Sequence, residues 1–254
     1  MYYEDAVYDE LKSITGIPTS LIESGGLKIY TTLDSEAQKT LETNVKETIT
    51  DENIQAASVI VNPQNGAVIS LIGGTDYTKS QYNRALQSKR QVGSTMKPFL
   101  YYAALDNGFT SASTFLSEET TFNFSTNNTY SPANYNNTYA HKDISMAAAI
   151  AYSDNIYAVK THLFLGEDTL VKTANMCGIK EKLESNPSLA LGTSELNMLD
   201  FATGYATLAS NGYNRDLYFI ERVEDLQGNV LYEHKVGDKI KITYTRDNKE
   251  KSTY

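Results

Sequence analysis

The sequence predicts the α+β class, with a sheet assembled from distant segments and helices lying between them in the chain. Stretches typical of strands occur near both ends, at 27–33, 56–72 and 218–232. The residues between them repeat apolar side chains at helical spacing, in segments that end at Gly or Asn-Gly. Hydrophobic residues make up 41 % of 254 positions, which is enough for a sizeable core in one large domain or two small ones.

The first part of the chain is predicted to contain a helix, a strand and a second helix. Apolar residues at i, i+4 and i+7 predict an amphipathic helix over 2–15. Alternation and β-branched residues predict a strand over 27–33. Asp34 or Ser35 is suited to cap a helix that runs to about residue 49.

The clearest hairpin follows this helix. Two apolar segments, 56–61 and 67–72, flank the turn sequence Asn-Pro-Gln-Asn-Gly at 62–66. Because both segments are almost continuously apolar, we expect them in the middle of a sheet that is covered on both faces.

The middle of the chain alternates irregular and helical segments. Residues 77–92 are polar and irregular, and a helix is predicted over 94–105 with Pro98 in its first turn. Residues 110–139 have no period and predict a long surface loop. The polarity of this loop suits the wall of a groove, or equally a solvated excursion.

Helices dominate the second half until a final hairpin. Residues 144–165 are helical in two parts, broken near 152–155. Helices are predicted over 169–177 and 196–210. Residues 218–223 and 230–232 predict a hairpin, and residues 240–244 could form a further strand.

Composition excludes several kinds of function. With 22 Lys+Arg against 31 Asp+Glu, the net charge of −9 leaves no broad surface for nucleic acid or anionic lipid. The single Cys177 excludes an internal disulfide framework and is expected to be a buried structural thiol. Because His141, His162 and His234 are scattered, we expect no metal site and no cofactor. The sequence shows neither a membrane span nor a signal peptide.

One segment carries the residue types of a nucleophilic site, Gly93-Ser-Thr-Met-Lys-Pro98. A serine hydroxyl needs a base within reach, and i and i+3 share a face at the start of a helix. Lys97 could therefore accept the Ser94 proton, provided that burial or another cation lowers the pKa of its amine. The helix N-terminus would also favour an oxyanion on the attacked carbonyl.

A second segment, Ser153-Asp-Asn155, lies in the predicted helix break. Ser153 could relay a proton between the lysine and a leaving group. The Asn155 amide could hold a substrate peptide or orient Lys97. A polar helix junction that caps itself explains the same residues without chemistry.

Ser-x-x-Lys together with Ser-Asp-Asn is the pairing found in penicillin-interactive enzymes, and at these residues the chain resembles the transpeptidase region of class A penicillin-binding proteins. Four further segments resemble the same family: 25–34, 57–67, 83–85 followed by 90–98, and 187–195. The resemblance covers about residues 1–235. It implies a β-lactamase/transpeptidase-like fold with a central, mostly antiparallel sheet flanked by helices.

The resemblance also implies a serine D,D-transpeptidase. Ser94 would attack the penultimate D-alanine of a peptidoglycan stem peptide, and the amine of a second strand would resolve the acyl-enzyme. β-Lactams would acylate the same serine. The implied roles are base for Lys97, proton relay for Ser153 and substrate-orienting amide for Asn155. Full-length members of the family are membrane-anchored, carry a glycosyltransferase module, and work on the outer face of the bacterial cytoplasmic membrane.

Two features depart from the family. The third motif, Lys-Thr/Ser-Gly, is absent, because Lys251-Ser-Thr253 lacks the glycine. Neither the anchor nor the glycosyltransferase module precedes the matched region. We therefore expect a piece of a larger protein, or a truncated or rearranged variant, with a linker at 1–34, a partial transpeptidase domain at 35–235 and an unassigned tail at 236–254. An incomplete sheet could also mediate self-association.

Two alternatives remain open. A class A β-lactamase shares the motif pairing, and Glu195-Leu-Asn197 resembles the loop that carries its deacylating glutamate. In that alignment Thr193 stands where the glutamate would be, so the acyl-enzyme should persist. The second alternative is a binding or structural module that keeps the fold but is catalytically inert. The missing third motif favours this alternative.

Overall fold

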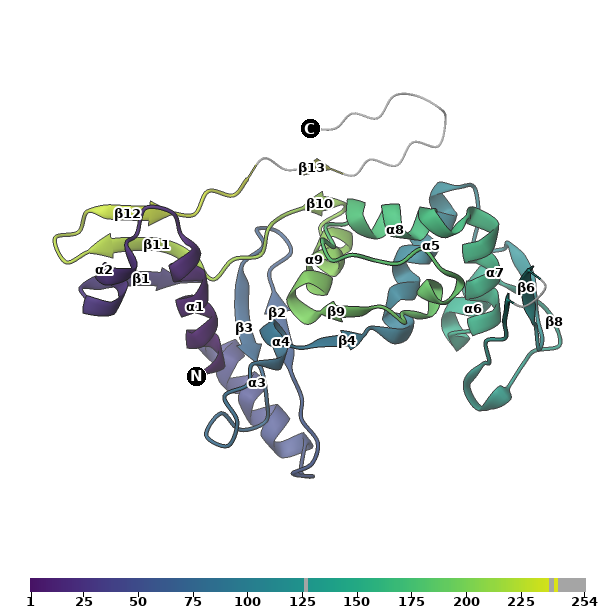
Figure 1. Cartoon of the computed structure of the whole chain (residues 1–254), viewed down its shortest axis with the longest axis horizontal. Coiled ribbons are helices and arrows are strands. Elements are labelled where there is room, and N and C mark those ends of the chain that lie inside the picture. Colours follow the sequence, from purple (N-terminus) through teal and green to yellow (C-terminus); the bar gives the residue numbers. More distant parts are fainter. Residues whose placement is uncertain (126–127, 238–239, 242–254) are drawn as a thin grey trace.

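The computed structural model describes residues 1–125, 128–237 and 240–241. The predicted α+β class is confirmed, and the molecule is elongated (Figure 1). A small sheet with helices α1 and α2 occupies one end, and helices α5 to α8 gather at the other. Strands β2 and β3 lie between these ends together with α3.

The elements have the following bounds. The helices are α1 (Tyr2–Ser13), α2 (Thr19–Ser24), α3 (Ser35–Thr48), α4 (Arg84–Gln87), α5 (Lys97–Asp106), α6 (Met146–Tyr152), α7 (Asn155–Leu165), α8 (Glu167–Met176) and α9 (Met198–Ala209). Shorter 3₁₀ turns are η1 (Gly93–Met96), η2 (Tyr135–Asn137) and η3 (Pro187–Leu191). The strands are β1 (Leu27–Thr31), β2 (Ser58–Val61), β3 (Val68–Ile72), β4 (Lys89–Gln91), β5 (Thr114–Ser117), β6 (Phe122–Ser125), β7 (Asn128–Tyr130), β8 (Lys142–Ser145), β9 (Glu195–Asn197), β10 (Tyr213–Asn214), β11 (Ile220–Asp225), β12 (Val230–Glu233) and β13 (Ile240–Lys241).

The sheet at one end joins the two halves of the sequence. Strand β1 pairs antiparallel with β11, which pairs antiparallel with β12. Leu11, Ile17, Ile220 and Val223 form a buried cluster beneath it, so α1 covers one face. The predicted hairpin of 218–232 is therefore present and takes a strand from the start of the chain as its third member.

The predicted hairpin of β2 and β3 packs on α3. The Asp34 carboxylate caps α3 by accepting hydrogen bonds from the N–H groups of Glu36 and Ala37, both at 3.0 Å. Gln38 is buried on the same helix and bonds the backbone N–H and C=O of Leu71. The expectation that this hairpin lies inside a wider sheet is wrong for the described residues, where its further partner is an isolated bridge from Ala67 to Tyr218. Helices, rather than further strands, cover β3.

The helical end has its own core around α5, α7 and α8. Phe99 and Leu100 of α5 are fully buried among Ala158, Leu170 and Ile179. Strand β4 pairs with β9 directly before the α5 turn, so that pairing ties the start of α5 to the residues before α9. This packing is what positions the candidate site described below.

The region predicted as a loop contains short strands. Strand β5 of this region pairs with β8, which follows the region, and β6 pairs with β7. These strands are only three or four residues long, which is too short for an alternation of apolar and polar residues to stand out in the sequence. Likewise α4 and β4 occur in the segment predicted as irregular.

The C-terminal strand is partly covered by the structure. Ile240 and Lys241 pair with β10, while the rest of the strand predicted over 240–244 lies outside the described residues. Among the helices that the structure describes, none is long and apolar enough to cross a bilayer.

Cys177 is buried beside this helical core, as predicted, with 1 % of its surface exposed. Burial raises the pKa of its thiol to about 11. Since the thiolate is the reactive form, we expect iodoacetamide at pH 8 to leave the native chain unlabelled and to alkylate the chain in denaturant. Mass spectrometry measures this directly, and equal labelling rates in the two states would contradict a buried structural role.

Candidate active site

The Ser-x-x-Lys segment forms a continuous turn and helix. Ser94 lies in η1, and Lys97 begins α5 and donates its backbone N–H to the Ser94 carbonyl. Side chains at i and i+3 nearly eclipse in a 3₁₀ turn, so the two residues share a face. Ser94 is exposed, whereas Lys97 is 4 % exposed.

Two contacts from distant segments hold this turn. The Gly93 N–H donates to the Gly192 carbonyl at 2.9 Å, immediately after the β4–β9 ladder. The Tyr205 hydroxyl on α9 donates to the Thr95 carbonyl at 2.7 Å. The backbone at Ser94 is therefore fixed on both sides by residues about a hundred positions later in the sequence.

The Ser-Asp-Asn segment forms the junction between α6 and α7. Ser153 ends α6 with φ +53° and ψ +42°, a left-handed conformation that is uncommon for a residue with a Cβ. The Asp154 carboxylate caps α7 by accepting a hydrogen bond from the Tyr157 N–H at 2.7 Å. The helix break predicted at 152–155 is thus confirmed, and it turns Ser153 toward Lys97.

Lys97 connects the two segments. Its Nζ donates to the Ser153 carbonyl at 2.7 Å, to Ser153 Oγ at 3.0 Å and to Asn155 Oδ1 at 2.7 Å. These three bonds use the three donors of an ammonium group. The amine is therefore held at the centre of the site, beside the hydroxyl predicted to exchange protons with it.

Burial changes the acidity of this amine. Desolvation lowers the pKa of Lys97 to about 8, and the charge of Asp154 opposes that shift. Desolvation disfavours the charged form of a lysine, so the neutral amine is populated near neutral pH. An amine with this pKa is suited to act as a base.

The structure brings three of the four predicted site residues into direct contact, namely Lys97, Ser153 and Asn155. The fourth, Ser94, lies one turn before Lys97, and its hydroxyl makes no hydrogen bond to the described residues. Asn155 uses its amide to orient Lys97, one of the two roles considered for it. Lys251-Ser-Thr253, which resembles the third family motif, lies outside the described residues.

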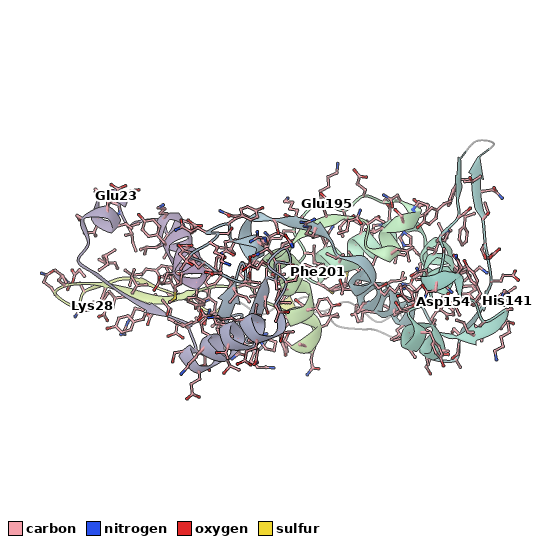
Figure 2. All side chains as sticks on the ribbon, turned by 90° about the horizontal axis from the view of Figure 1, so that it is seen from below. Glu23, Lys28, His141, Asp154, Glu195 and Phe201 are labelled. Atoms are coloured by element: carbon pink, nitrogen blue, oxygen red, sulfur yellow. The ribbon has the colours of Figure 1, made fainter. Side chains whose placement is uncertain are left out.

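Sequence patterns missed the residues that support this junction. Ser117 Oγ and Asn134 Nδ2 both donate to Asp154 Oδ2, at 2.6 and 2.8 Å. Both residues belong to the segment predicted as a surface loop, which therefore forms one wall of the site. Figure 2 labels Asp154 and His141 at this end of the molecule and Lys28 of β1 at the opposite end. A lone polar residue in an aperiodic segment carries no signal for such a distant contact.

Comparison with known proteins gives one consistent picture. Residues 56–252 match the family described as penicillin binding protein transpeptidase domain. The chain is 46 % identical to penicillin-binding protein 2D of Bacillus subtilis over 92 % of its own length and 34 % of that protein's. It is 37 % identical to penicillin-binding protein 1A of Pseudomonas aeruginosa over 70 % of its length and 22 % of that protein's. The chain thus spans about a third or less of these relatives.

A solved structure shares the fold. The PonA1 protein of Mycobacterium tuberculosis in complex with penicillin V superposes with a TM-score of 0.81 at 26 % identity, over 91 % of this chain and 64 % of that one. This likeness confirms the predicted transpeptidase-like fold.

Proposed function

The chain belongs to the penicillin-binding protein transpeptidase family, and we propose that it is the serine D,D-transpeptidase part of a protein that cross-links peptidoglycan. The observation that carries the proposal is the buried Lys97 amine, bonded to both Ser153 and Asn155 and one turn from Ser94. A structural helix junction does not require a buried amine whose pKa is lowered to about 8.

Acylation would begin when the neutral Lys97 amine takes the Ser94 proton. For this step one of its three present hydrogen bonds gives way, and a lone pair turns to Ser94 Oγ. Ser94 Oγ then forms a bond to the carbonyl carbon of the penultimate D-alanine. The proton reaches the leaving amide nitrogen through Ser153 Oγ, which lies 3.0 Å from the amine, and the terminal D-alanine departs.

Cross-linking would reverse this order of proton transfers. The amine of a second stem peptide attacks the acyl carbon, loses a proton through Ser153 and Lys97, and Ser94 regains its hydrogen. The positive end of α5 beside Ser94 favours the negative oxygen of each tetrahedral intermediate. A β-lactam carbonyl would be attacked in the same way, and its ring-opened acyl group would stay on Ser94.

Partners and location follow from the same proposal. The substrates would be peptidoglycan stem peptides, which lie on the outer face of the bacterial cytoplasmic membrane. A membrane anchor and a glycosyltransferase module would belong to the longer protein from which this region derives, as in the class A family that the sequence resembles.

The decisive experiment is intact-mass analysis of the purified chain after incubation with a fluorescent penicillin. We expect one covalent adduct, mapped by peptide sequencing to Ser94, that persists on the order of hours because Thr193, and not a glutamate, stands where a water-activating base would be. Ser94→Ala is the control and should form no adduct. Absence of an adduct on the folded chain would favour the inert binding module.

The β-lactamase alternative has a separate outcome in the same experiment. In that reaction the adduct would disappear within minutes as water hydrolyses it. Thr193, which stands where the deacylating glutamate would be, donates or accepts a hydrogen bond with Ser188 at 2.8 Å and has no basic group. Persistence of the adduct therefore supports the transpeptidase over the β-lactamase.

A further inference from the structure

The Ser153–Asn155 junction depends on a support outside its own helices. Ser153 holds a left-handed backbone conformation, and such conformations persist where surrounding contacts impose them. Helix α6 supplies one restraint, because the Asp154 N–H donates to the Ala149 carbonyl at 3.0 Å. The opposite side of the junction faces residues 133–138 of the long segment between β7 and β8.

The Asn134 side chain bonds the junction through both ends of its amide. Its Nδ2 donates to Asp154 Oδ2 at 2.8 Å and to the Thr138 carbonyl at 3.0 Å. Its Oδ1 accepts from the Asn155 N–H at 2.7 Å and, at a longer 3.4 Å, from the Ile156 N–H. One side chain thus ties the Asp154 carboxylate and the start of α7 to the loop.

These bonds continue directly to Lys97, the base of the proposed mechanism. Asn155 Nδ2 donates to the Ala133 carbonyl at 2.7 Å, which fixes the plane of the Asn155 amide. The oxygen of the same amide accepts from Lys97 Nζ at 2.7 Å. Residues 133 and 134 therefore set the position of the acceptor that Asn155 offers to Lys97, and Asn134 also restrains Asp154, the residue that follows Ser153.

We propose that Asn134 is a positioning residue, which holds the Ser153–Asn155 junction closed over Lys97 and so keeps the amine buried and aligned with the two serines. The proposal rests on the proposed function, in which Lys97 is the base. The side chain of Asn134 bonds Thr138, Asp154, Asn155 and Ile156, so it acts on Lys97 through the junction.

The charges around Lys97 give the direction of the expected effect. Asp154 is the described ionisable group whose charge acts on Lys97, and it raises the pKa of that amine while burial lowers it. Asn134 and Ser117 both donate to the Asp154 carboxylate and so compensate its charge. Without Asn134, water would reach the Lys97 amine and replace the protein atoms that accept its hydrogen bonds. The negative charge of Asp154 would also lose one of its two side-chain donors. Both changes raise the pKa of Lys97.

The test is Asn134→Ala in the acylation assay, measured from pH 6 to 10. We expect the acylation rate at pH 7 to fall about tenfold and the midpoint of the pH profile to rise by about one unit, since each unit removes about nine-tenths of the neutral amine. Asn134→Asp is the second variant if alanine does not fold. It retains the acceptor oxygen, loses the donors, and should shift the midpoint in the same direction.

Asn197→Ala is the matched control. Asn197 Oδ1 likewise accepts two backbone N–H groups, from Leu199 at 2.9 Å and Asp200 at 3.4 Å, and its Nδ2 donates to the Leu86 carbonyl. This variant should lower the melting temperature and leave the pH midpoint where it is in the wild type. An unshifted midpoint in Asn134→Ala, or an equal shift in Asn197→Ala, would overturn the positioning role.

A readout without turnover separates this proposal from the proposed function. NMR titration with ¹³C-labelled lysine reports the pKa of Lys97, assigned by comparison with Lys97→Met. We expect that pKa to rise in Asn134→Ala. If the wild type forms no penicillin adduct yet the pKa shifts, the proposed function fails and the positioning role stands. If the wild type is acylated and the pKa does not shift, the positioning role fails alone.

Discussion

Lys97→Ala is expected to lower the acylation rate by about 10²- to 10⁴-fold, the contribution typical of a positioned general base. In the proposed mechanism the Lys97 amine takes the Ser94 proton, because a serine hydroxyl such as Ser153 is itself a poor base and Asn155 has no basic atom. Stopped-flow fluorescence with a labelled penicillin measures the rate, and circular dichroism confirms that the variant is folded.

Lys97→Met is the matched control for this result. Methionine fills much of the buried space of the lysine stem but carries no amine, so its acylation rate should fall as far as that of Lys97→Ala. A Met variant that is acylated at the wild-type rate would show that the lysine acts through packing and not as the base.

The pH profile of the wild type adds an independent check on Lys97. Its pKa of about 8 lies below the ordinary value of 10.5 because the amine is buried. About a tenth of the amines are then neutral at pH 7, against about 1 in 3,000 for an exposed lysine. In the proposed mechanism the neutral amine is the active form, so the rate should rise with pH, reach half its maximum near pH 8 and level off above it. A flat profile between pH 6 and 9 would exclude this role.

Gly192→Ala is expected to reduce acylation by about 100-fold or more, because displacing a reacting group by about 1 Å has an effect of this size. A Cβ at Gly192 would lie 2.5 Å from the backbone N and 2.6 Å from the carbonyl carbon of Gly93, and backbone atoms cannot rotate away. Gly192 also has φ +69°, where a side chain is strained. The turn that carries Ser94 would have to move.

Gly166→Ala separates the collision from the backbone strain. Gly166 also has a positive φ, +85°, but a Cβ there meets nothing within 4 Å. Because ψ is +135° there, a backbone region that residues with a Cβ rarely adopt, its variant should lose about 1–3 kcal/mol of unfolding free energy and keep its acylation rate. Thermal melts and acylation rates of both variants test this. Near-wild-type acylation of Gly192→Ala would mean that the Gly93 turn tolerates displacement.

Local patterns were sufficient to predict the elements that carry strong periodicity or cap residues. The helix that begins after Asp34, the hairpin around Asn62–Gly66 and the break between α6 and α7 all occur where the sequence places them. Each depends on residues within a few positions of one another. The fold as a whole followed from family resemblance, since no local pattern specifies that β1 pairs with β11.

In the candidate site too, local motifs could be predicted from the sequence and distant contacts could not. Ser94, Lys97, Ser153 and Asn155 stood out because their residue types and spacing form two short motifs. Asn134 and Gly192 did not, because their roles depend on contacts across 20 and about 100 residues of chain. A glycine or asparagine in an irregular segment has many ordinary explanations, and only the folded backbone shows which atoms face it.

The left-handed backbone at Ser153 lowers the free energy of unfolding at a position whose side-chain hydroxyl is part of the candidate site. Glycine adopts this conformation without the cost of about 1–2 kcal/mol that a side chain incurs. A chain selected for folding alone would therefore favour glycine there, at the expense of the hydroxyl 3.0 Å from Lys97. If Ser153 relays protons as proposed, serine at this position is a trade-off in which part of the folding free energy is given up to keep the hydroxyl in place.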